Sequence, residues 1–332
     1  MNVLVSLVTR DDAGFLPRCL ESVLAQVPPA AVRVVDCASR DGSAEVARRF
    51  GVPVREAAEN LGYSRAHNRN VDLRFPYVLF LNADVYLEEG FVEALLEAAE
   101  AHPGAGILGG KLYRADDALE RRLGAGGLPL LDSTGVYFTP WFRHFDRGSN
   151  EPDRGQFERT EAVFGITGAA LLARSRCLEE IRCLGEYFDE DFFAYREDVD
   201  LSWRARLAGW ECLYVPAARG RHFRKVLPAQ RRRVEPLANY HSVKNRFLLR
   251  MKLLDRAVAR RCFPYLWIRD LVVVAGVLAW ERSSLAALRE ARRLRPRMLE
   301  KRAWIMARRR ILPDAMAEWF SFRPHSRPPA NR

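Results

Sequence analysis

Apolar positions in the first eighty residues alternate between two patterns. Short apolar runs, typical of buried strands, occupy residues 3–8, 32–35, 52–54 and 77–81. Between them, apolar residues recur with helical spacing over residues 12–24, 43–50 and 64–73. Strands that alternate with helices at this spacing predict a parallel, doubly wound α/β sheet with both faces covered. Ligands of such sheets bind at the carboxyl ends of the strands.

The rest of the chain follows other patterns. Residues 124–159 are rich in Gly, Pro, Asp and aromatic residues with little periodicity, which predicts a long loop or hairpin over the ligand site. Over residues 236–313 the pattern is almost entirely helical, with a break near Pro296. We therefore expect an α/β domain over residues 1–225 and a helical region over residues 226–332.

Charge divides the chain in nearly the same place. The formal net charge is +11, yet residues 1–218 hold 24 Lys and Arg against 34 Asp and Glu. Residues 219–332 hold 29 Lys and Arg against 8 Asp and Glu. This asymmetry indicates a cation-binding site in the first part and a segment facing an anionic surface in the second.

The basic segment combines arginine clusters with tryptophans. These residues are Arg231–Arg233, Arg292, Arg293, Arg295, Arg297 and Arg308–Arg310, with Trp267, Trp280, Trp304 and Trp319. Basic helices with interfacial aromatic residues are typical of proteins that lie on an anionic membrane, although a solvated arginine-rich surface is the alternative. The apolar run 271–280 is ten residues long, too short to span a bilayer.

Cysteine usage and the N-terminus indicate a compartment. The six cysteines form no C-x-x-C pair, which favours reduced thiols of a cytosolic protein over a zinc site. The N-terminus lacks a basic region and a small-residue cleavage site, so no signal peptide is expected. With the basic helices, these features predict a cytoplasmic protein that is peripheral at the inner face of the plasma membrane.

Polar residues follow two of the predicted strands directly. Asp84, in the sequence Asn82-Ala83-Asp84, could hold a hard divalent cation that grips a diphosphate, or it could cap the following helix. Asp36 ends the second strand, where its carboxylate could accept a hydrogen bond from the N3–H of uracil or thymine. The turn that follows, Asp41-Gly42-Ser43, is typical of a turn and helix cap.

An acidic cluster lies between residues 188 and 201. It contains six carboxylates within twelve residues, interleaved with aromatic side chains. Asp198 and Asp200 stand at the start of a predicted helix, where the helix dipole favours the ionised form. An ionised carboxylate beside a sugar site could act as general base for an acceptor hydroxyl, whereas the alternative is a simple acidic helix cap.

These motifs, taken in order, resemble the family 2 glycosyltransferases of the GT-A fold, particularly the bacterial rhamnosyltransferase-like branch. The matching positions are 5–10 with 20–23, 35–43, 59–63 with Asn68, 81–84, Gly165 with 168–169, 188–201 with Arg204 and 209–210, and His222. The resemblance covers about residues 1–225. Each motif is weakly specific alone, and their shared order is what makes the resemblance strong.

The resemblance implies a GT-A catalytic domain that binds a nucleotide sugar. The implied reaction is an inverting, metal-dependent transfer of a sugar from a nucleotide-diphosphate donor. The implied acceptor is a saccharide or lipid-linked saccharide in cell-surface polysaccharide synthesis, and the lipid-linked form is favoured because the basic helices suggest a membrane surface.

The resemblance also assigns roles to particular residues. The implied donor-nucleotide residues are Thr9, Arg10, Asp36, Asn60, Gly62, Asn68 and Asn82. Asp84 would hold Mg²⁺ or Mn²⁺ on the diphosphate, with His222 as a second ligand or a phosphate contact. Asp198 would be the catalytic base. The candidate acceptor-site residues are Tyr195, Glu197, Asp200 and Trp203.

Two positions depart from the usual family pattern. Cys37 replaces the Asn that commonly follows the aspartate of the second strand, so any contact from that side chain is lost. Asn82 replaces the first Asp of the usual Asp-x-Asp motif, which in relatives commonly contacts ribose hydroxyls. A neutral Asn fits a deoxyribose donor such as dTDP-rhamnose somewhat better.

Three other classes of protein share some of these sequence features. A nucleic-acid-binding protein would account for the basic segment but not for the acidic residues at the strand ends, so no nucleic-acid partner is expected. A nicotinamide-dependent dehydrogenase would need a G-x-G-x-x-G sequence after the first strand, where residues 8–12 read Val-Thr-Arg-Asp-Asp. A catalytically inactive relative that only binds a nucleotide sugar stays open at this point.

Overall fold

The structure of the chain, a computed structural model, describes residues 2–115, 123–224, 236–279 and 285–330. Its strands are β1 (Val3–Thr9), β2 (Ala31–Asp36), β3 (Val54–Glu56), β4 (Tyr77–Asn82), β5 (Val85–Leu87), β6 (Ala105–Arg114), β7 (Leu131–Ser133), β8 (Val136–Thr139), β9 (Arg143–Asp146), β10 (Glu161–Val163), β11 (Ala170–Arg174), β12 (Glu211–His222) and β13 (Ser326–Arg327). Its helices are α1 (Leu16–Leu24), α2 (Ser43–Arg49), α3 (Gly62–Asn68), α4 (Phe91–Ala101), α5 (Ser175–Ile181), α6 (Glu197–Leu207), α7 (Pro236–Leu253), α8 (Arg256–Cys262), α9 (Tyr265–Ala279), α10 (Leu285–Arg293), α11 (Arg295–Ala307) and α12 (Pro313–Ala317), with 3₁₀ turns at Ala125–Gly127 and Glu190–Phe192.

One large sheet organises the α/β part. Its strand order is β13-β10-β12-β6-β11-β4-β1-β2-β3, with β5 on β12 and β7 on β6. Strands β4, β1, β2 and β3 are parallel, as are β6 and β12, whereas β11 runs antiparallel between β4 and β6. The predicted doubly wound, mostly parallel sheet is therefore confirmed.

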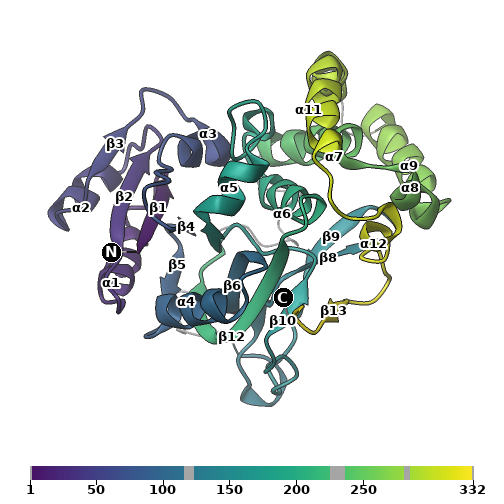
Figure 1. Cartoon of the computed structure of the whole chain (residues 1–332). Coiled ribbons are helices and arrows are strands. Elements are labelled where there is room, and N and C mark those ends of the chain that lie inside the picture. Colours follow the sequence, from purple (N-terminus) through teal and green to yellow (C-terminus); the bar gives the residue numbers. More distant parts are fainter. Residues whose placement is uncertain (1, 116–122, 225–235, 280–284, 331–332) are drawn as a thin grey trace.

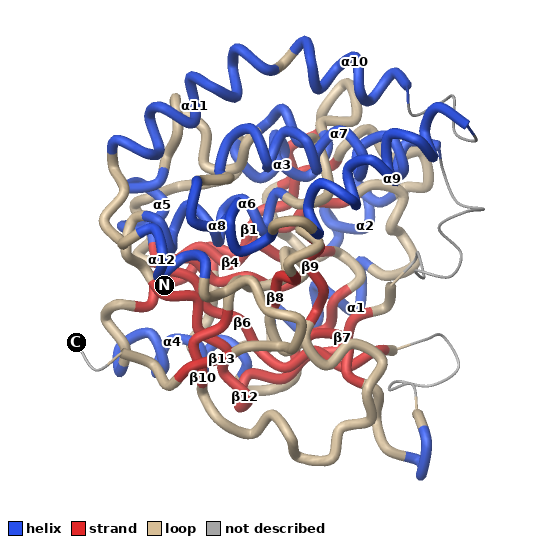
Figure 2. The backbone as a smooth tube through the Cα atoms, turned by 90° about the vertical axis from the view of Figure 1, so that its right-hand side faces the viewer, coloured by secondary structure: helices blue, strands red, loops and turns tan. Residues whose placement is uncertain are grey.

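Both faces of the sheet are covered, which is why its central strands are apolar throughout. On β4, Leu79 and Leu81 pack into a core with α1 and α4, while Val78 and Phe80 pack on the opposite side with α5 and α6. Figures 1 and 2 show these helices lying on the two sides of the sheet. A strand buried on both faces cannot alternate polar with apolar residues, so its sequence is a continuous apolar run.

The C-terminal helices pack on the α/β part and share a core with it. One hydrophobic cluster joins Phe138 of β8 and Trp203 of α6 with Leu248 of α7, Met298 of α11 and Phe320 after α12. In Figure 1, α7, α8, α9 and α11 gather on the side of the molecule away from α2 and β3. The final strand β13 pairs with β10, so the C-terminal region also extends the sheet. The division at residue 225 stays a prediction, but the two regions do not have separate cores.

Buried ion pairs hold the C-terminal helices against the acidic cluster. The ammonium group of Lys301 on α11 lies 2.9, 2.5 and 2.8 Å from carboxylate oxygens of Glu186, Asp189 and Asp191. Lys252 on α7 lies 2.5 Å from carboxylate oxygens of both Asp189 and Asp200. Much of the acidic cluster therefore neutralises cations of the C-terminal helices, a role that the sequence did not reveal.

Some arginines of the basic segment form ion pairs within the protein and are not free to contact a membrane. Arg297 pairs with Asp191 at 2.8 Å and Arg310 pairs with Glu180, so these arginines contact the protein itself. Arg292 and Arg295 are exposed. The cluster Arg231–Arg233 lies outside the described residues, as does Trp280. Within the described part of the chain, no helix has the length and apolar character needed to cross a membrane.

One further segment is shorter than expected, and another takes one of its two expected forms. The third helix is α3, which ends at Asn68 rather than near residue 73. The region 124–159 holds β7 and an antiparallel hairpin of β8 and β9, and this hairpin supplies residues to the cavity described below. Of the two expected forms, a long loop or a hairpin, the structure has the hairpin. The bounds of its strands were not predicted, because aromatic and charged residues obscure their short alternation.

Candidate active site

Three polar residues stand together at the carboxyl edge of the parallel strands. Thr9 on β1 pairs in register with Asp36 on β2, and Val8 pairs with Asn82 on β4. One oxygen of Asp36 accepts a hydrogen bond from the backbone N–H of Ser39 at 3.0 Å. The other oxygen is buried and has no hydrogen-bond partner among the described residues. A buried carboxylate oxygen left open in this way fits an N–H donor on a ligand.

The loop after β1 is held in place by its own side chains. Asp12 accepts hydrogen bonds from the hydroxyl of Thr9 at 3.1 Å and from the backbone N–H of Arg10 at 2.8 Å. Asn60 accepts a hydrogen bond from the backbone N–H of Gly62 at 3.0 Å. These hydrogen bonds hold the loops of Thr9, Arg10 and Asn60 in place, and donor binding by the three residues stays a prediction.

Asn68 and Gly62 have structural roles in addition to the donor contacts predicted from the sequence. The side-chain amide of Asn68 donates to the backbone C=O of Phe188 at 2.7 Å and accepts from its N–H at 2.8 Å. Asn68 therefore positions the acidic segment, and its contact with a nucleotide stays a prediction. Gly62 has a φ of +68°, and a Cβ there would lie 2.6 Å from the carbonyl oxygen of Phe193. The close backbone approach that requires glycine is made to Phe193.

Asp84 and His222 come together through the pairing of β5 with β12. His222 pairs in register with Val85, so its ring lies beside Asp84, with Nε2 3.6 Å from Oδ1. Its Nδ1 lies 2.8 Å from Oδ2 of Asp132, which also pairs with Arg224 at 2.7 Å. A histidine whose second ring nitrogen is fixed by a carboxylate is a common arrangement for metal ligands.

The charge of His222 reflects these neighbours. Burial disfavours the charged ring, but the carboxylates of Asp132 and Asp84 outweigh it and raise the pKa of His222 to about 9. Among the described residues, no group of three or more His, Cys, Asp and Glu is arranged to hold a metal. A cation at Asp84 and His222 would therefore need further ligands from a bound substrate, such as phosphate oxygens.

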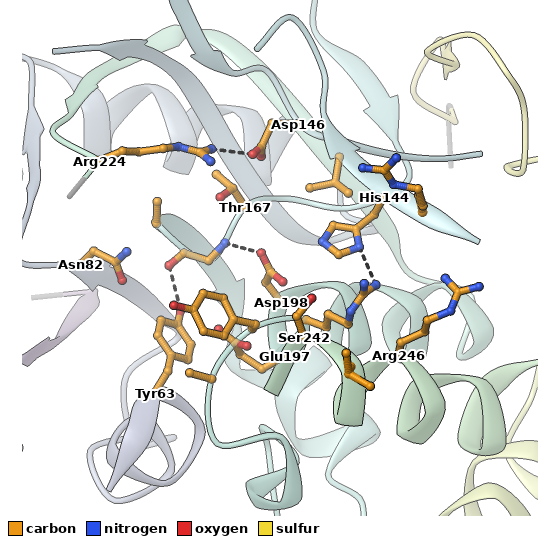
Figure 3. Close-up of a pocket in the computed structure, with 18 of the residues that line it drawn as sticks. Tyr63, Asn82, His144, Asp146, Thr167, Glu197, Asp198, Arg224, Ser242 and Arg246 are labelled. Atoms are coloured by element: carbon orange, nitrogen blue, oxygen red, sulfur yellow. Dashed lines mark hydrogen bonds and ion pairs between the residues drawn. The ribbon is translucent and has the colours of Figure 1, made fainter. Parts of the chain in front are cut away.

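A cavity of about 560 Å³ opens beside these groups. Its lining residues include Asn82, His144, His222, Arg224, Ser242 and Arg246. Figure 3 shows Asn82 and Arg224 on one side, Arg246 on the opposite side, and Asp198 with Thr167 between them. Asp84 does not line the cavity itself, but it contacts His222, which does.

Asp198 is the carboxylate best placed for chemistry in this cavity. Its Oδ2 accepts a hydrogen bond from the backbone N–H of Gly168 at 2.9 Å, and its Oδ1 accepts one from Val199 at 2.7 Å. Burial raises the pKa of Asp198, while these two hydrogen bonds act in the opposite direction. The result is a carboxylate that is a stronger base than an ordinary aspartate and is fixed in orientation.

Glu197 also lines the cavity but differs in charge. Burial and the nearby Asp198 raise the pKa of Glu197 well above its usual range. Its Oε2 is buried and finds no hydrogen-bond partner in the described part of the protein. Of the two adjacent acids, Glu197 therefore holds a proton more readily than Asp198.

Two of the predicted acceptor-site residues lie elsewhere. Trp203 is fully buried in the core shared with the C-terminal helices. Asp200 is also fully buried, and it pairs with Arg204 at 2.9 Å and with Lys252. Both predictions are wrong because these side chains lie on faces of α6 that turn away from the cavity. Tyr195 and Glu197 do line it.

The segment before Glu197 has a backbone that its sequence disfavours. Phe193, Tyr195 and Arg196 all have φ near +70°, which costs of order 1–3 kcal/mol for each such residue. The buried side-chain amide of Asn245, on α7, donates to three carbonyl oxygens of this segment at 2.7–2.9 Å, those of Phe192, Ala194 and Tyr195. A residue of the C-terminal region thus fixes the turn that presents Glu197 and Asp198.

Several lining residues were not predicted from the sequence. They are Tyr63, Arg143, His144, Asp146, Thr167, Arg224, Ser242, Arg246 and Arg269. The hydroxyl of Tyr63 donates to the carbonyl of Gly168 at 2.8 Å, and Arg196 lies 3.0 Å from Nδ1 of His144. Tyr63 and Gly168 stood within recognised motifs, but nothing in the sequence indicated that α7 and α9 reach the same cavity as the hairpin.

Comparison with known proteins places the chain in a family. The model of glycosyl transferase family 2 matches residues 5–177. The N-acetylglucosaminyl-diphospho-decaprenol L-rhamnosyltransferase of Mycobacterium tuberculosis, strains CDC 1551 and H37Rv, is 32% identical over 241 residues, which cover 66% of this chain and 75% of that protein.

Solved structures share the fold at low identity. Residues 1–349 of S. aureus TarS align with a TM-score of 0.55 and 15% identity over 96% of this chain and 90% of that chain. GalNAc-T7, solved with UDP, GalNAc and Mn²⁺, aligns with a TM-score of 0.57 and 13% identity over 96% of this chain and 58% of that chain. Together with the sheet order and the family match, these findings show that the chain belongs to glycosyl transferase family 2, in its rhamnosyltransferase-like branch.

Proposed function

We propose that this chain is an inverting, metal-dependent glycosyltransferase that transfers rhamnose from dTDP-rhamnose to a lipid-linked saccharide in cell-surface polysaccharide synthesis. The observation that carries the proposal is the position of Asp198 between the strand-end groups and a second end of the same cavity. The M. tuberculosis relative is named for L-rhamnosyl transfer to a diphospho-decaprenol saccharide, which supports the sugar and the acceptor class. The neutral Asn82 supports a deoxyribose nucleotide.

The proposed reaction is a single displacement. Asp198 accepts the proton of an acceptor hydroxyl as that oxygen forms a bond to the anomeric carbon of the donor. The bond between this carbon and the donor's phosphate oxygen breaks, and the nucleoside diphosphate leaves from the opposite face. One displacement of this kind inverts the configuration at the anomeric carbon. Asp36, through its open oxygen, would bind the N–H of the pyrimidine.

The residues present fit a divalent cation at the diphosphate. Asp84 and His222 would hold Mg²⁺ or Mn²⁺, because carboxylate oxygen suits such an ion and Asp132 fixes the ring of His222, which would release its proton to bind. When bound, the cation would offset negative charge on the leaving diphosphate as a Lewis acid. Two protein ligands leave room for the phosphate oxygens of the donor.

Loss of Asp84 should weaken donor binding in the presence of metal. We expect Asp84→Ala to raise the dissociation constant for dTDP-rhamnose with Mn²⁺ about 100-fold, because a direct ligand should contribute at least as much as outer-shell partners do. Calorimetry with and without EDTA measures this. Asp314→Ala, an exposed aspartate on α12, is the matched control and should bind the donor normally. Equal donor affinity for Asp84→Ala and the intact protein in Mn²⁺ would show that Asp84 is not a metal ligand.

The activity itself is tested by turnover of nucleotide sugars. Hydrolysis or transfer assays with dTDP-rhamnose and with UDP sugars, each with Mn²⁺, should show turnover that EDTA removes. Binding of a nucleotide sugar without any turnover would instead favour an inactive, nucleotide-sugar-binding relative.

We also propose that the protein binds an anionic membrane surface peripherally. Support comes from α9, where Trp267, Ile268, Leu271 and Val272 are 54%, 48%, 71% and 62% exposed; these four residues are called the α9 apolar face. Arg250 stacks on the ring of Trp267 at 4.3 Å, so a cation accompanies the exposed apolar surface. Apolar surface combined with cations is typical of helices that lie in the membrane interface.

Polar substitution of the α9 apolar face should release the protein from vesicles. We expect Trp267→Ser with Leu271→Ser to lower partition to phosphatidylglycerol vesicles about tenfold or more, since each lost apolar side chain removes about 1.5–3 kcal/mol of burial. Co-sedimentation at low and high salt measures it, and salt should weaken binding of the intact protein. Leu312→Ser, at a 76% exposed position before α12, is the control. Failure of the intact protein to bind anionic vesicles would contradict the proposal.

A further inference from the structure

The end of the cavity away from Asn82 is lined by guanidinium groups. Arg143 comes from β9, Arg246 from α7 and Arg269 from α9, so three separate elements bring cations to one place; these residues are called the arginine cluster. In Figure 3, Arg246 lies on the opposite side of Asp198 from Asn82. The cluster is therefore separate from the groups proposed to bind the donor.

Arg246 of this cluster shares its carboxylate partner with another arginine. Arg246 donates two hydrogen bonds to Asp270, at 3.0 and 2.7 Å, and Arg250 pairs with the same carboxylate. One carboxylate thus serves two guanidinium groups. The Nε of Arg269 is buried and has no hydrogen-bond partner in the part of the chain that the structure describes.

Arg269 also experiences repulsion from its neighbours. Burial, together with the charges of Arg143 and Arg246, lowers the pKa of Arg269 to about 10. Arginine at this pKa is still cationic at neutral pH. Cations gathered at a cavity wall with an unused buried N–H are unfavourable alone and are stabilised by a bound anion.

The helix that carries Arg269 also carries the α9 apolar face. Trp267, Ile268, Leu271 and Val272 are exposed on it, while Val273 lines the cavity with Arg269. One helix therefore presents a cation to the cavity and apolar side chains to the outside. A ligand that joins an anionic group to a lipid chain matches both surfaces.

We propose that the arginine cluster binds the phosphate groups that join the acceptor's saccharide to its lipid, and that the lipid chain leaves the cavity over the α9 apolar face. The inference rests on the proposed function, since it assigns the acceptor end of the same cavity. Guanidinium groups bind phosphate through paired N–H donors, which suits a cluster of arginines better than one of lysines. The saccharide attached to the phosphate then lies toward Asp198.

Equilibrium binding without turnover tests the inference. Farnesyl diphosphate is titrated into the full-length protein in EDTA, so that no divalent cation is present to hold a diphosphate at Asp84 and His222. Arg269→Gln should weaken this binding about 10- to 100-fold, the effect of losing a charged hydrogen-bond partner. Arg143→Gln, at an exposed position on β9, should weaken it in the same direction and is a second variant should Arg269→Gln fold poorly. Arg292→Gln, exposed on α10, is the matched control.

Two further ligands distinguish the source of the affinity. Farnesol lacks the phosphates, so its binding should not depend on Arg269. Inorganic pyrophosphate lacks the lipid, so it should bind more weakly than farnesyl diphosphate and should still depend on Arg269. Unchanged farnesyl diphosphate binding in Arg269→Gln and Arg143→Gln, or an equal loss of farnesol binding, would overturn the inference. An intact protein that hydrolyses a nucleotide sugar with Mn²⁺ but does not bind farnesyl diphosphate would overturn this inference alone and leave the proposed function standing.

Discussion

Replacing Asp198 with asparagine should lower turnover by about 10²–10⁴-fold while donor affinity stays nearly unchanged. Asparagine keeps the shape of the side chain and can still accept the hydrogen bond from Gly168, but it cannot take a proton from an acceptor hydroxyl. Steady-state transfer assays give the loss of turnover, and calorimetry with the nucleotide sugar gives donor affinity.

The pH dependence supplies a second readout of the same role. Activity requires the ionised form of Asp198, so it falls as pH drops through the pKa of this group. Because burial raises that pKa, the acid limb of kcat/KM should lie at higher pH than an ordinary aspartate would give. The limb should disappear in Asp198→Asn.

Glu197 is the natural comparison for Asp198. Because the pKa of Glu197 is raised well above its usual range, we expect this side chain to hold its proton and not to act as the base. Glu197→Gln should then leave turnover within about tenfold of the intact enzyme, below the general-base range. Near-normal transfer by Asp198→Asn together with a large loss in Glu197→Gln would assign the base to Glu197. Asp200 is no longer an alternative, because Arg204 and Lys252 occupy its carboxylate.

Replacing Lys301 with methionine should lower the free energy of unfolding by about 3–5 kcal/mol, the typical cost of leaving buried charges without their partner. The ammonium group is 1% exposed and contacts three carboxylates. Methionine fills a similar volume, so the loss reports charge and not a cavity. Denaturant unfolding measures it, and Arg292→Met, exposed on α10, should stay within about 0.5 kcal/mol of the intact protein.

The pH dependence of stability should identify the same ion pairs. Burial disfavours the charged forms, but Lys252 and Lys301 lower the pKa of Asp189, and the carboxylates raise the pKa of Lys301. The lowered aspartate stabilises the fold above its unfolded pKa of about 3.9, and this part is lost on acidification. The raised lysine stabilises it below its unfolded pKa of about 10.4, and this part is lost at higher pH. A loss under 1 kcal/mol in Lys301→Met would show that the network contributes little.

The positions of the strand-end residues could be predicted from the local sequence. Thr9, Asp36 and Asn82 follow apolar runs whose burial on both faces forces parallel strands, and parallel strands bring their carboxyl ends to one edge. The resemblance to a family then supplied the roles of these residues, which local pattern alone leaves open. His222 needed the resemblance as well, because the pairing of β5 with β12 that brings it to Asp84 joins distant segments.

The local sequence could not predict which carboxylates of the acidic cluster face the cavity. Asp198 and Asp200 lie two positions apart on α6, about 200° around the helix axis, so they face opposite sides. The pattern places both at the start of a helix but does not say which side meets the cavity. The side of α6 that carries Asp200 faces the protein interior, where the carboxylate pairs with Lys252 of α7.

By itself, the sequence determined the α/β sheet, the polar strand ends, a helix that starts beside Asp198 and the opposite charge of the two regions. These features depend on neighbours along the chain, namely apolar runs, caps and residue counts. Only the tertiary structure decided which charges pair, which arginines gather at the acceptor end and that Asn245 holds the turn before Glu197. Electrostatic and hydrogen-bond partners are set by distance in space, and packing brings together residues that the sequence holds far apart.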